Sequence, residues 1–213
     1  MTADRREVLR YLGYGGHAAD EAVTVLIAEC ENELSEAATP RFVSQMLLLR
    51  RLMDGSLNCG FFRTDSKKLS KTLSGCGQVL VMAATLGAGV DRLLARYGRL
   101  SLTKAVVMQA TAAALMEAYC NELCTGWREE YERKGLYLRP RFSPGYGDFP
   151  LSCQEGLLNG LQAGKRIGIT LTEGSLMMPS KSVTAVIGIS ENKEFCTVTG
   201  CEICEKTDCA YRR

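Results

Sequence analysis

Histidine is almost absent from this 213-residue sequence, which contains only His17. Catalytic triads and many metal sites need histidine beside nucleophilic or acidic partners, and a lone residue supplies no such set. A phosphate-binding P-loop and an HExxH metalloprotease motif are missing too. The sequence therefore gives no support for these chemistries, and we expect His17 to be a polar cap at the start of a helix.

The sequence also lacks an excess of charge and any long apolar run. Its 26 Lys and Arg residues nearly balance its 24 Asp and Glu residues, and they are scattered. This balance argues against nucleic acid as the main partner. No run reaches the roughly 18 apolar residues of a membrane span, and the start MTADRREVLRYLGYGG has no apolar signal core. We therefore expect a cytoplasmic protein that binds neither nucleic acid nor membranes.

Periodic patterns are present along most of the chain. Helical patterns cover residues 3–12, 17–34, 90–98, 101–133 and 151–161. Strand patterns cover residues 77–85, 167–172 and 183–189, and we expect one or two strands within residues 42–63, where the alternation is less clear. The mixture predicts a protein with both helices and sheet, and nothing in it marks an internal repeat.

The Ala-rich helix over residues 101–133 carries a carboxylate among small and apolar side chains. At helical spacing, one face holds Val106, Ala110, Ala113, Glu117, Cys120 and Cys124. Glu117 either faces the ammonium or hydroxyl groups of a ligand or lies at the edge of this stripe and reaches water. The pattern alone favours the second interpretation.

Residues 139–150, RPRFSPGYGDFP, contain three of the five prolines. Proline fixes φ and cannot donate a ladder hydrogen bond, so this segment is a stiff, extended loop. One interpretation is a rigid linker that covers a core. The other is a ligand-binding loop that holds Arg141 and Tyr146 in fixed positions.

The ten cysteines fall into two groups. The dispersed ones are interpreted as small core residues, and they are Cys30, Cys59, Cys76, Cys120, Cys124 and Cys153. The others form a C-x4-C-x2-C-x4-C pattern near the end of the chain, at Cys196, Cys201, Cys204 and Cys209. This spacing predicts a metal site, with Zn²⁺ and an iron–sulfur cluster both open. Free or redox-paired thiols are the alternative.

Two motifs in order resemble the activation domain of cobalamin-dependent methionine synthase. They are RFSPGYGDFPL and, some twenty residues later, IGITLTEGSLMMPSKSVTAVIGI. The start REVLRYLGYGG and the turn AATLG are similar to those of stand-alone, single-domain relatives. The resemblance implies an α+β fold with a curved antiparallel sheet and flanking helices over residues 1–195, followed by a cysteine-rich tail over residues 196–213.

The resemblance also implies a function. The family binds S-adenosylmethionine and restores methionine synthase whose cobalamin has been oxidised. A separate donor such as a flavodoxin or ferredoxin supplies one electron, and the sulfonium then methylates the cobalt. The chain has no cobalamin-binding signature, so a partner methionine synthase would carry the corrin. The protein would be an accessory component with little turnover alone.

The family's site residues can be carried over position by position. Arg141, rather than Arg139, would hold the methionine carboxylate, Tyr146 would close over the ligand, Gly145 would border it, and Glu117 would lie beside the same pocket. Further lining candidates are Thr172, Glu173, Ser182 and Val183. Two departures stand out: Met178 replaces a tryptophan, and the aspartate that larger members place on the ligand's amino group has no identified equivalent.

Two other functions are compatible with the sequence. The first is a metal-sensing or electron-transfer module in which the cysteine tail is the active part. The second is an activator of a different corrinoid methyltransferase. Ligand binding separates the first from the methionine synthase hypothesis, and partner identity separates the second.

Overall fold

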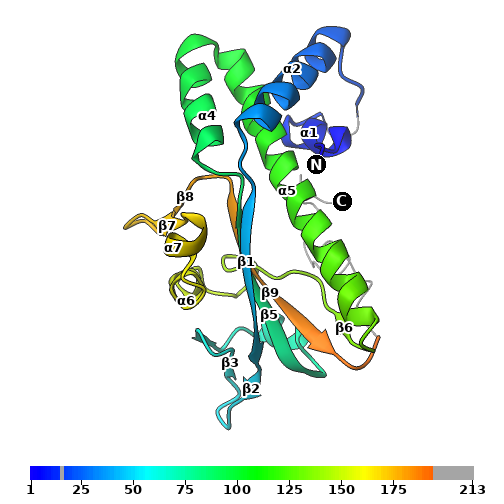
Figure 1. Ribbon diagram of the computed structural model, residues 1–213, viewed down its shortest axis with the longest axis vertical. Helices are drawn as coiled ribbons and strands as arrows, with labels where there is room; N and C mark the ends of the chain where they lie inside the picture. Colours follow the sequence, from blue (N-terminus) through cyan, green and yellow to red (C-terminus); the bar gives the residue numbers. More distant parts are fainter. Residues whose placement is uncertain (15–16, 194–213) are drawn as a thin grey trace.

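Helices and strands are mixed along the chain (Figure 1). The structure is a computed structural model, and it describes residues 1–14 and 17–193. The helices are α1 (Arg5–Tyr11), α2 (Glu21–Ala37), α3 (Lys67–Thr72), α4 (Ala88–Leu100), α5 (Leu102–Glu132), α6 (Cys153–Gly160) and α7 (Ala163–Ile167). The strands are β1 (Arg41–Leu48), β2 (Arg50–Arg51), β3 (Leu57–Asn58), β4 (Arg63–Thr64), β5 (Cys76–Thr85), β6 (Tyr137–Leu138), β7 (Thr170–Leu171), β8 (Met177–Met178) and β9 (Ser182–Ser190).

The central sheet is antiparallel, with the strand order β1-β5-β9-β6. Its long inner strands, β5 and β9, are rich in the β-branched and apolar residues that fit a pleated, buried surface. Two small sheets accompany it, β2-β3-β4 and β7-β8. The α+β class with an antiparallel sheet that the resemblance implied is confirmed.

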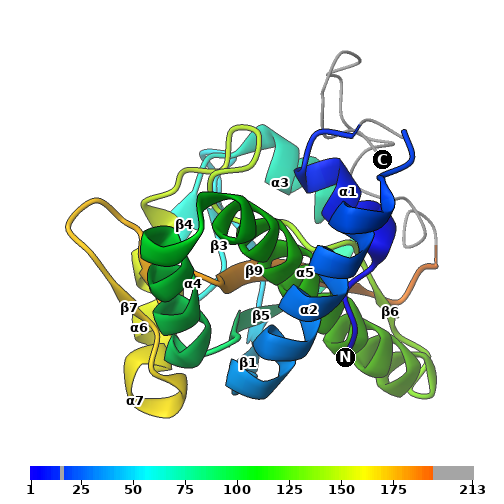
Figure 2. The ribbon, with the colours of Figure 1, turned by 90° about the horizontal axis from the view of Figure 1, so that it is seen from above.

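The sheet separates two hydrophobic cores, because alternate residues of a strand point to opposite faces. On one face, Leu80, Met82 and Ile187 pack with α1, α2, α4 and α5. On the other, Val79, Val81 and Val186 pack with α3, α6 and α7. Figure 2 shows α2, α4 and α5 side by side over the sheet.

Helix α5 is the longest element, at 31 residues, or about 46 Å. Ser101 caps it, since its side chain accepts a hydrogen bond from Lys104 N. The face expected from the sequence is only partly buried: Ala110 is in the core, but Val106 is 53% exposed. The buried stripe is shifted toward Val107, Met108, Thr111 and Leu115, because the sheet and α2 cover that side.

Two expectations from the sequence are wrong. Residues 167–172 are not one strand: α7 ends at Ile167, Gly168 takes a left-handed conformation with φ +78°, and only Thr170–Leu171 is extended. His17 does not cap a helix. Helix α2 begins at Glu21, and Asp20 caps it by accepting a hydrogen bond from Val23 N.

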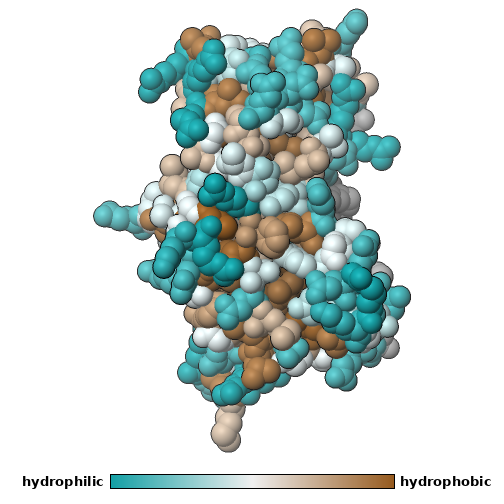
Figure 3. Space-filling model, in the orientation of Figure 1, coloured by the Kyte–Doolittle hydropathy of each residue, from teal (hydrophilic) through white to brown (hydrophobic). Residues whose placement is uncertain are grey.

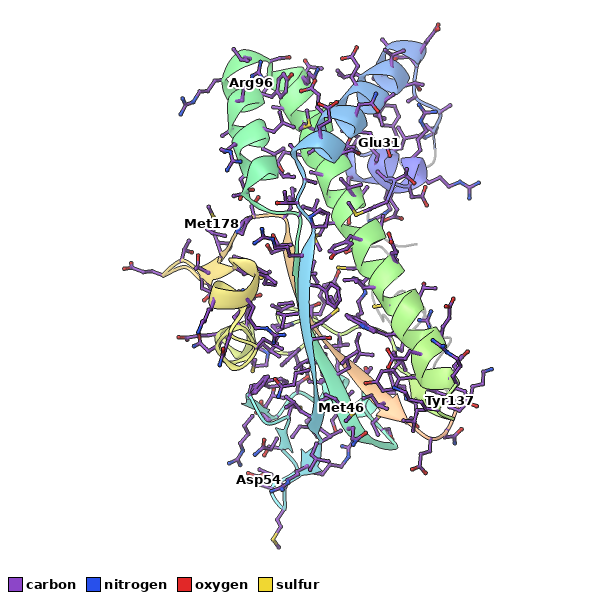
Figure 4. All side chains as sticks on the ribbon, viewed as in Figure 1. Glu31, Met46, Asp54, Arg96, Tyr137 and Met178 are labelled. Carbon is purple, nitrogen blue, oxygen red and sulfur yellow. The ribbon has the colours of Figure 1, made fainter. Side chains whose placement is uncertain are left out.

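Strand β1 is an edge strand, and apolar side chains project from it. Phe42, Met46 and Leu48 are 43%, 49% and 60% exposed. Figure 3 shows apolar patches on this face, and Figure 4 labels Met46 on the strand. The Phe42 ring meets Trp127 of α5 edge-on, with 5.7 Å between ring centroids. The edge is therefore an exposed apolar surface beside α5, of a kind that often contacts other proteins.

Candidate functional site

The proline loop, residues 139–150, is anchored in the protein at both ends. Phe142 forms an isolated bridge with Val186 of β9. Phe149 is 1% exposed and lies against the rings of Phe62 and Phe142. The segment is thus a fixed loop, as its prolines predicted.

Tyr146 lies at the tip of this loop. Gly145 N donates to Phe149 O at 2.8 Å, and Phe149 N donates to Tyr146 O at 2.9 Å. Gly145 adopts φ +89°, a conformation that a residue with a Cβ rarely takes. The Tyr146 side chain is 71% exposed, so its ring is accessible to a ligand.

Arg141 contacts two acceptors on α5. Its Nη2 donates to Glu117 Oε2 at 3.1 Å and to Asn121 Oδ1 at 2.8 Å. The side chains of Arg141 and Glu117 are only 18% and 29% exposed. Burial by itself lowers the pKa of Arg141, but electrostatic interactions with Cys120, Glu117 and Cys124 outweigh it and raise the pKa above its ordinary value. The guanidinium therefore stays charged.

Glu117 and Asn121 also line a pocket of about 410 Å³ between the N-terminal segment and α5. This volume lies within the roughly 300–1,000 Å³ of small-molecule sites. The full lining is Thr2, Ala3, Asp4 and Glu7 on one wall and Ala114, Glu117, Ala118 and Asn121 on the other. The small side chains on α5 leave the room that the pocket occupies.

The charged groups around this pocket are mainly acidic. Glu7 pairs with Arg10 at 2.5 Å, and Asp4 caps α1 by accepting a hydrogen bond from Arg6 N. Three carboxylates, of Asp4, Glu7 and Glu117, line the pocket without a basic side chain among its described lining residues, and the guanidinium groups of Arg10 and Arg141 pair with Glu7 and Glu117. The arrangement suits a ligand with both a carboxylate and an excess of positive charge.

The N-terminal wall is held in place by α2. Ala3 N donates to Glu31 Oε1 at 2.8 Å, and Figure 4 labels Glu31 where α2 meets α1. Sequence reasoning did not identify Asp4, Glu7 or Asn121. A signal existed for Asn121, which follows Glu117 by one helical turn. Asp4 could be recognised only as a helix cap, because its approach to α5 is a long-range contact.

The candidates from the motif IGITLTEGSLMMPSKSVTAVIGI lie mainly away from the Arg141–Glu117 pair. Thr172 and Glu173 are at the turn of the β7–β8 hairpin, which packs through Leu171 on the core opposite α5. Figure 4 labels Met178 on this hairpin, on the far side of β1 from the lower half of α5. The structure does not bring these residues to the Arg141–Glu117 pair.

Ser182 and Val183, at the start of β9, have different surroundings. The Ser182 hydroxyl hydrogen-bonds to Thr85 Oγ1 at 2.8 Å and donates to Pro179 O at 2.7 Å. Val183 packs with the core on the α5 face. Among the second-motif candidates, Val183 therefore shares a sheet face with Glu117.

Arg139 is a buried residue of the fold. Its residue is 4% exposed, and its Nη2 donates to Ser74 O at 3.1 Å. The loop therefore separates its two arginines, with Arg139 inside the fold and Arg141 beside the pocket.

The dispersed cysteines are free thiols in or near the core, as expected from the sequence. Burial raises the pKa of Cys59 and of Cys120 to about 12. The expected metal ligands Cys196, Cys201, Cys204 and Cys209 lie outside the described residues. Among residues 1–14 and 17–193, no cluster of three or more His, Cys, Asp or Glu side chains is suited to a metal ion.

A membrane span would need a long, apolar helix. None of the helices in the described part of the chain combines the length and hydropathy to cross a bilayer.

Comparison with known proteins identifies the family. Residues 69–213 match the family model "Vitamin B12 dependent methionine synthase, activation domain". Among solved structures, a MetH reactivation domain bound to AdoHcy superposes with a TM-score of 0.60, covering 88% of this chain and 77% of that one at 19% identity. None of the curated proteins compared with the chain matches it. The chain belongs to the family of activation domains of vitamin B12-dependent methionine synthase.

Proposed function

We propose that this protein is an S-adenosylmethionine-binding activation subunit for a cobalamin-dependent methionine synthase. The Arg141–Glu117 pair beside an acidic pocket is the observation that carries the proposal. The fold supports it, because the similar MetH reactivation domain was crystallised with AdoHcy, which differs from S-adenosylmethionine by one methyl group and one positive charge.

The charges of the pocket complement the amino-acid end of this ligand. Arg141 would bind the carboxylate through its planar fork, and Glu117 would face the ammonium. Asp4 is our candidate for the N-terminal aspartate of larger family members, because it lines the pocket opposite Glu117. The acidic lining favours the sulfonium ligand over its neutral, demethylated product.

The other residues proposed to contact the ligand rest partly on the structure and partly on the motif alone. Gly145 and Tyr146 would border the ligand, since the exposed Tyr146 ring sits on a fixed loop. Val183 shares the α5 face of the sheet. Thr172, Glu173 and Ser182 rest on the motif alone, and a role for them would require the ligand or partner to extend past the sheet.

The chemistry would take place with the corrin of a partner. One electron from a donor such as a flavodoxin or ferredoxin would convert the partner's cob(II)alamin to cob(I)alamin. The methyl group of the bound sulfonium would then pass to the cobalt, leaving S-adenosylhomocysteine. This chain would bind and orient the methyl donor, so its contribution is placement rather than turnover alone. The exposed apolar edge of β1 offers a surface for such a transient contact.

Methyl transfer tests this role. Isotope-labelled S-adenosylmethionine is mixed with the chain, a reductant and a cobalamin-binding methionine synthase lacking its own activation domain, with cobalt in the cob(II) state. We expect label on the corrin only when the chain is present. Label that appears equally without the chain would contradict the proposal. Transfer only with another corrinoid protein would instead identify a different methyltransferase as the partner.

The cysteine tail remains a separate prediction. The spacing of Cys196, Cys201, Cys204 and Cys209 favours a metal site, either Zn²⁺ or an iron–sulfur cluster. Anaerobic purification with metal analysis and a visible spectrum distinguishes them: iron with sulfide indicates a cluster, and about one zinc per chain indicates a tetrathiolate site. Four titratable tail thiols without metal would refute the prediction.

A further inference from the structure

Asp148 joins the proline loop to the first turn of α3. One carboxylate oxygen accepts a hydrogen bond from Ser66 Oγ at 2.5 Å, and the other accepts one from Lys67 N at 2.8 Å. Lys68 N approaches the two oxygens at 3.2 and 3.3 Å. A carboxylate is stabilised here because the first amides of a helix have no partner within the helix.

Ser66 extends this contact into the core. Its hydroxyl donates to Asp148 and accepts from Leu69 N at 3.0 Å, which makes Ser66 the cap of α3. Leu69 is fully buried in the core between the sheet and α3, α6 and α7. Asp148 therefore binds to a fixed part of the protein.

Gly147 adds a close approach between the loop and α3. It adopts φ +59°, and a Cβ placed on it would lie 2.6 Å from Cδ of Lys68. A Cβ here would require the flexible Lys68 side chain to move, and the left-handed backbone conformation itself favours glycine. The sequence Gly147-Asp148 thus brings the tip of the loop onto the start of α3.

Tyr146 depends on this contact for its position. The residue is 71% exposed, so packing of its own side chain does little to fix it. Its carbonyl accepts from Phe149 N, and Gly145 N donates to Phe149 O, so Asp148 lies within the short turn that carries Tyr146. Phe149 is buried in the core directly after Asp148, and Asp148 itself binds the start of α3, so the turn has two adjacent points of attachment.

We propose that Asp148 is a positioning residue for S-adenosylmethionine: by binding the start of α3, it fixes Tyr146 where the tyrosine meets the ligand. The inference rests on the proposed function. It assigns a role to a residue whose side chain contacts Ser66 and the first turn of α3.

The test compares Asp148→Ala with Asp65→Asn. Asp65 is an exposed carboxylate in the same segment, just before Ser66, so this control removes the same charge without the contact. By calorimetric titration, we expect Asp148→Ala to weaken S-adenosylmethionine binding about tenfold, the size of one lost capping interaction. Asp65→Asn should stay within about twofold of the unmodified protein. Equal effects of the two variants would overturn the proposal.

A double-mutant cycle separates positioning from general destabilisation. In a Tyr146→Ala background, Asp148→Ala should weaken binding by less than about twofold, because the group that it positions is already gone. The same tenfold loss in both backgrounds would show that Asp148 does not act through Tyr146. Asp148→Asn, which keeps one acceptor oxygen, provides a milder variant if Asp148→Ala does not fold.

Amide hydrogen exchange without ligand tests the contact by itself. Asp148→Ala should speed exchange at Lys67, Lys68 and the turn over residues 145–149, whereas Asp65→Asn should not. Unchanged exchange would overturn the contact with α3. If the unmodified protein bound no S-adenosylmethionine, the proposed function would fail, and faster exchange in Asp148→Ala would then identify a purely structural anchor.

Discussion

Arg141 already has two oxygen partners before any ligand arrives. Glu117 and Asn121 lie one turn apart on α5 and together orient the guanidinium. Both bonds come from Nη2, and a guanidinium has five N–H groups, so a ligand carboxylate can bind other N–H groups of Arg141 without displacing either oxygen. The preformed pair lowers the cost of ordering the arginine side chain on binding.

Arg141→Ala should therefore weaken S-adenosylmethionine binding by about 2–4 kcal/mol, because the ligand carboxylate would be desolvated without its cation. Titration calorimetry measures the loss. Arg128→Ala is the matched control, since Arg128 is an exposed arginine farther along α5. Arg139 is unsuited to this purpose because it is buried in the fold. Similar losses for Arg128 and Arg141 would remove Arg141 from the site.

The buried cysteines should be unreactive at neutral pH. Burial raises the pKa of Cys30 to about 11 and that of Cys120 to about 12, far above the roughly 8.5 of a free thiol. The reactive thiolate is therefore nearly absent at pH 7 and becomes appreciable only as the pH approaches these values.

Iodoacetamide labelling followed by peptide mass spectrometry checks this expectation. Cys30 and Cys120 should remain unmodified in the native protein and be labelled after unfolding in urea. Equal labelling rates in the two states would show that these thiols are accessible, contrary to the packing described above.

At the scale of elements, one network ties three helices together. Lys104 of α5 contacts Glu33 of α2 at 2.7 Å, and Glu33 accepts a hydrogen bond from Tyr97 of α4, also at 2.7 Å. The bond from Lys104, followed by that from Tyr97, lowers the pKa of Glu33 below its usual value. The carboxylate therefore stabilises the packing of the helices that form one layer of the protein.

Glu33→Gln should lower the free energy of unfolding by about 1 kcal/mol at pH 7. Because the folded-state pKa of Glu33 is lowered, its contribution is present above the unfolded-state pKa of roughly 4.3 and is lost as the pH falls through the folded-state value. The difference between Glu33→Gln and the unmodified protein should then shrink in acid. Urea unfolding of both proteins at pH 7 and in acid measures this difference.

Glu36→Gln serves as the control, since Glu36 is exposed on the same helix. It should change stability little at either pH. A Glu33→Gln effect that persists unchanged in acid would mean that packing, rather than the carboxylate charge, is responsible.

The sequence predicted long elements better than short ones. The helix over residues 101–133 and the strands over 77–85 and 183–189 have enough apolar residues to define a period. The five-residue α7 is too short for that, and the turn at Gly168 left only two residues for β7. His17 failed as a cap because Asp20 competes with it directly before α2.

The site was predictable where local sequence carries it and missed where it depends on distant contacts. Arg141 and Glu117 follow from motif resemblance, and the structure brings them together at 3.1 Å. The pocket wall at Asp4 depends on how α1 packs against α5, which no local pattern reveals. The separation of Thr172 from that pair likewise follows from the sheet, since the β7–β8 hairpin packs on its other face.

At the scale of the whole molecule, the proline loop links the two layers. Arg141 contacts α5 on one face of the sheet, whereas Phe149 belongs to the core on the other. Asp148 adds a contact with α3 in that second layer. The positions of Arg141 and Tyr146 are therefore set by the packing of both layers, and mutations in either core are expected to alter binding.

Calorimetric titration of the purified chain with S-adenosylmethionine tests the central claim most directly. Our account predicts saturable binding of one ligand per chain, with weaker binding of S-adenosylhomocysteine because the acidic pocket loses its attraction for the sulfonium charge. Binding should be sharply reduced in Arg141→Ala and retained in Arg128→Ala. Absence of saturable binding by the folded, unmodified protein would contradict the account.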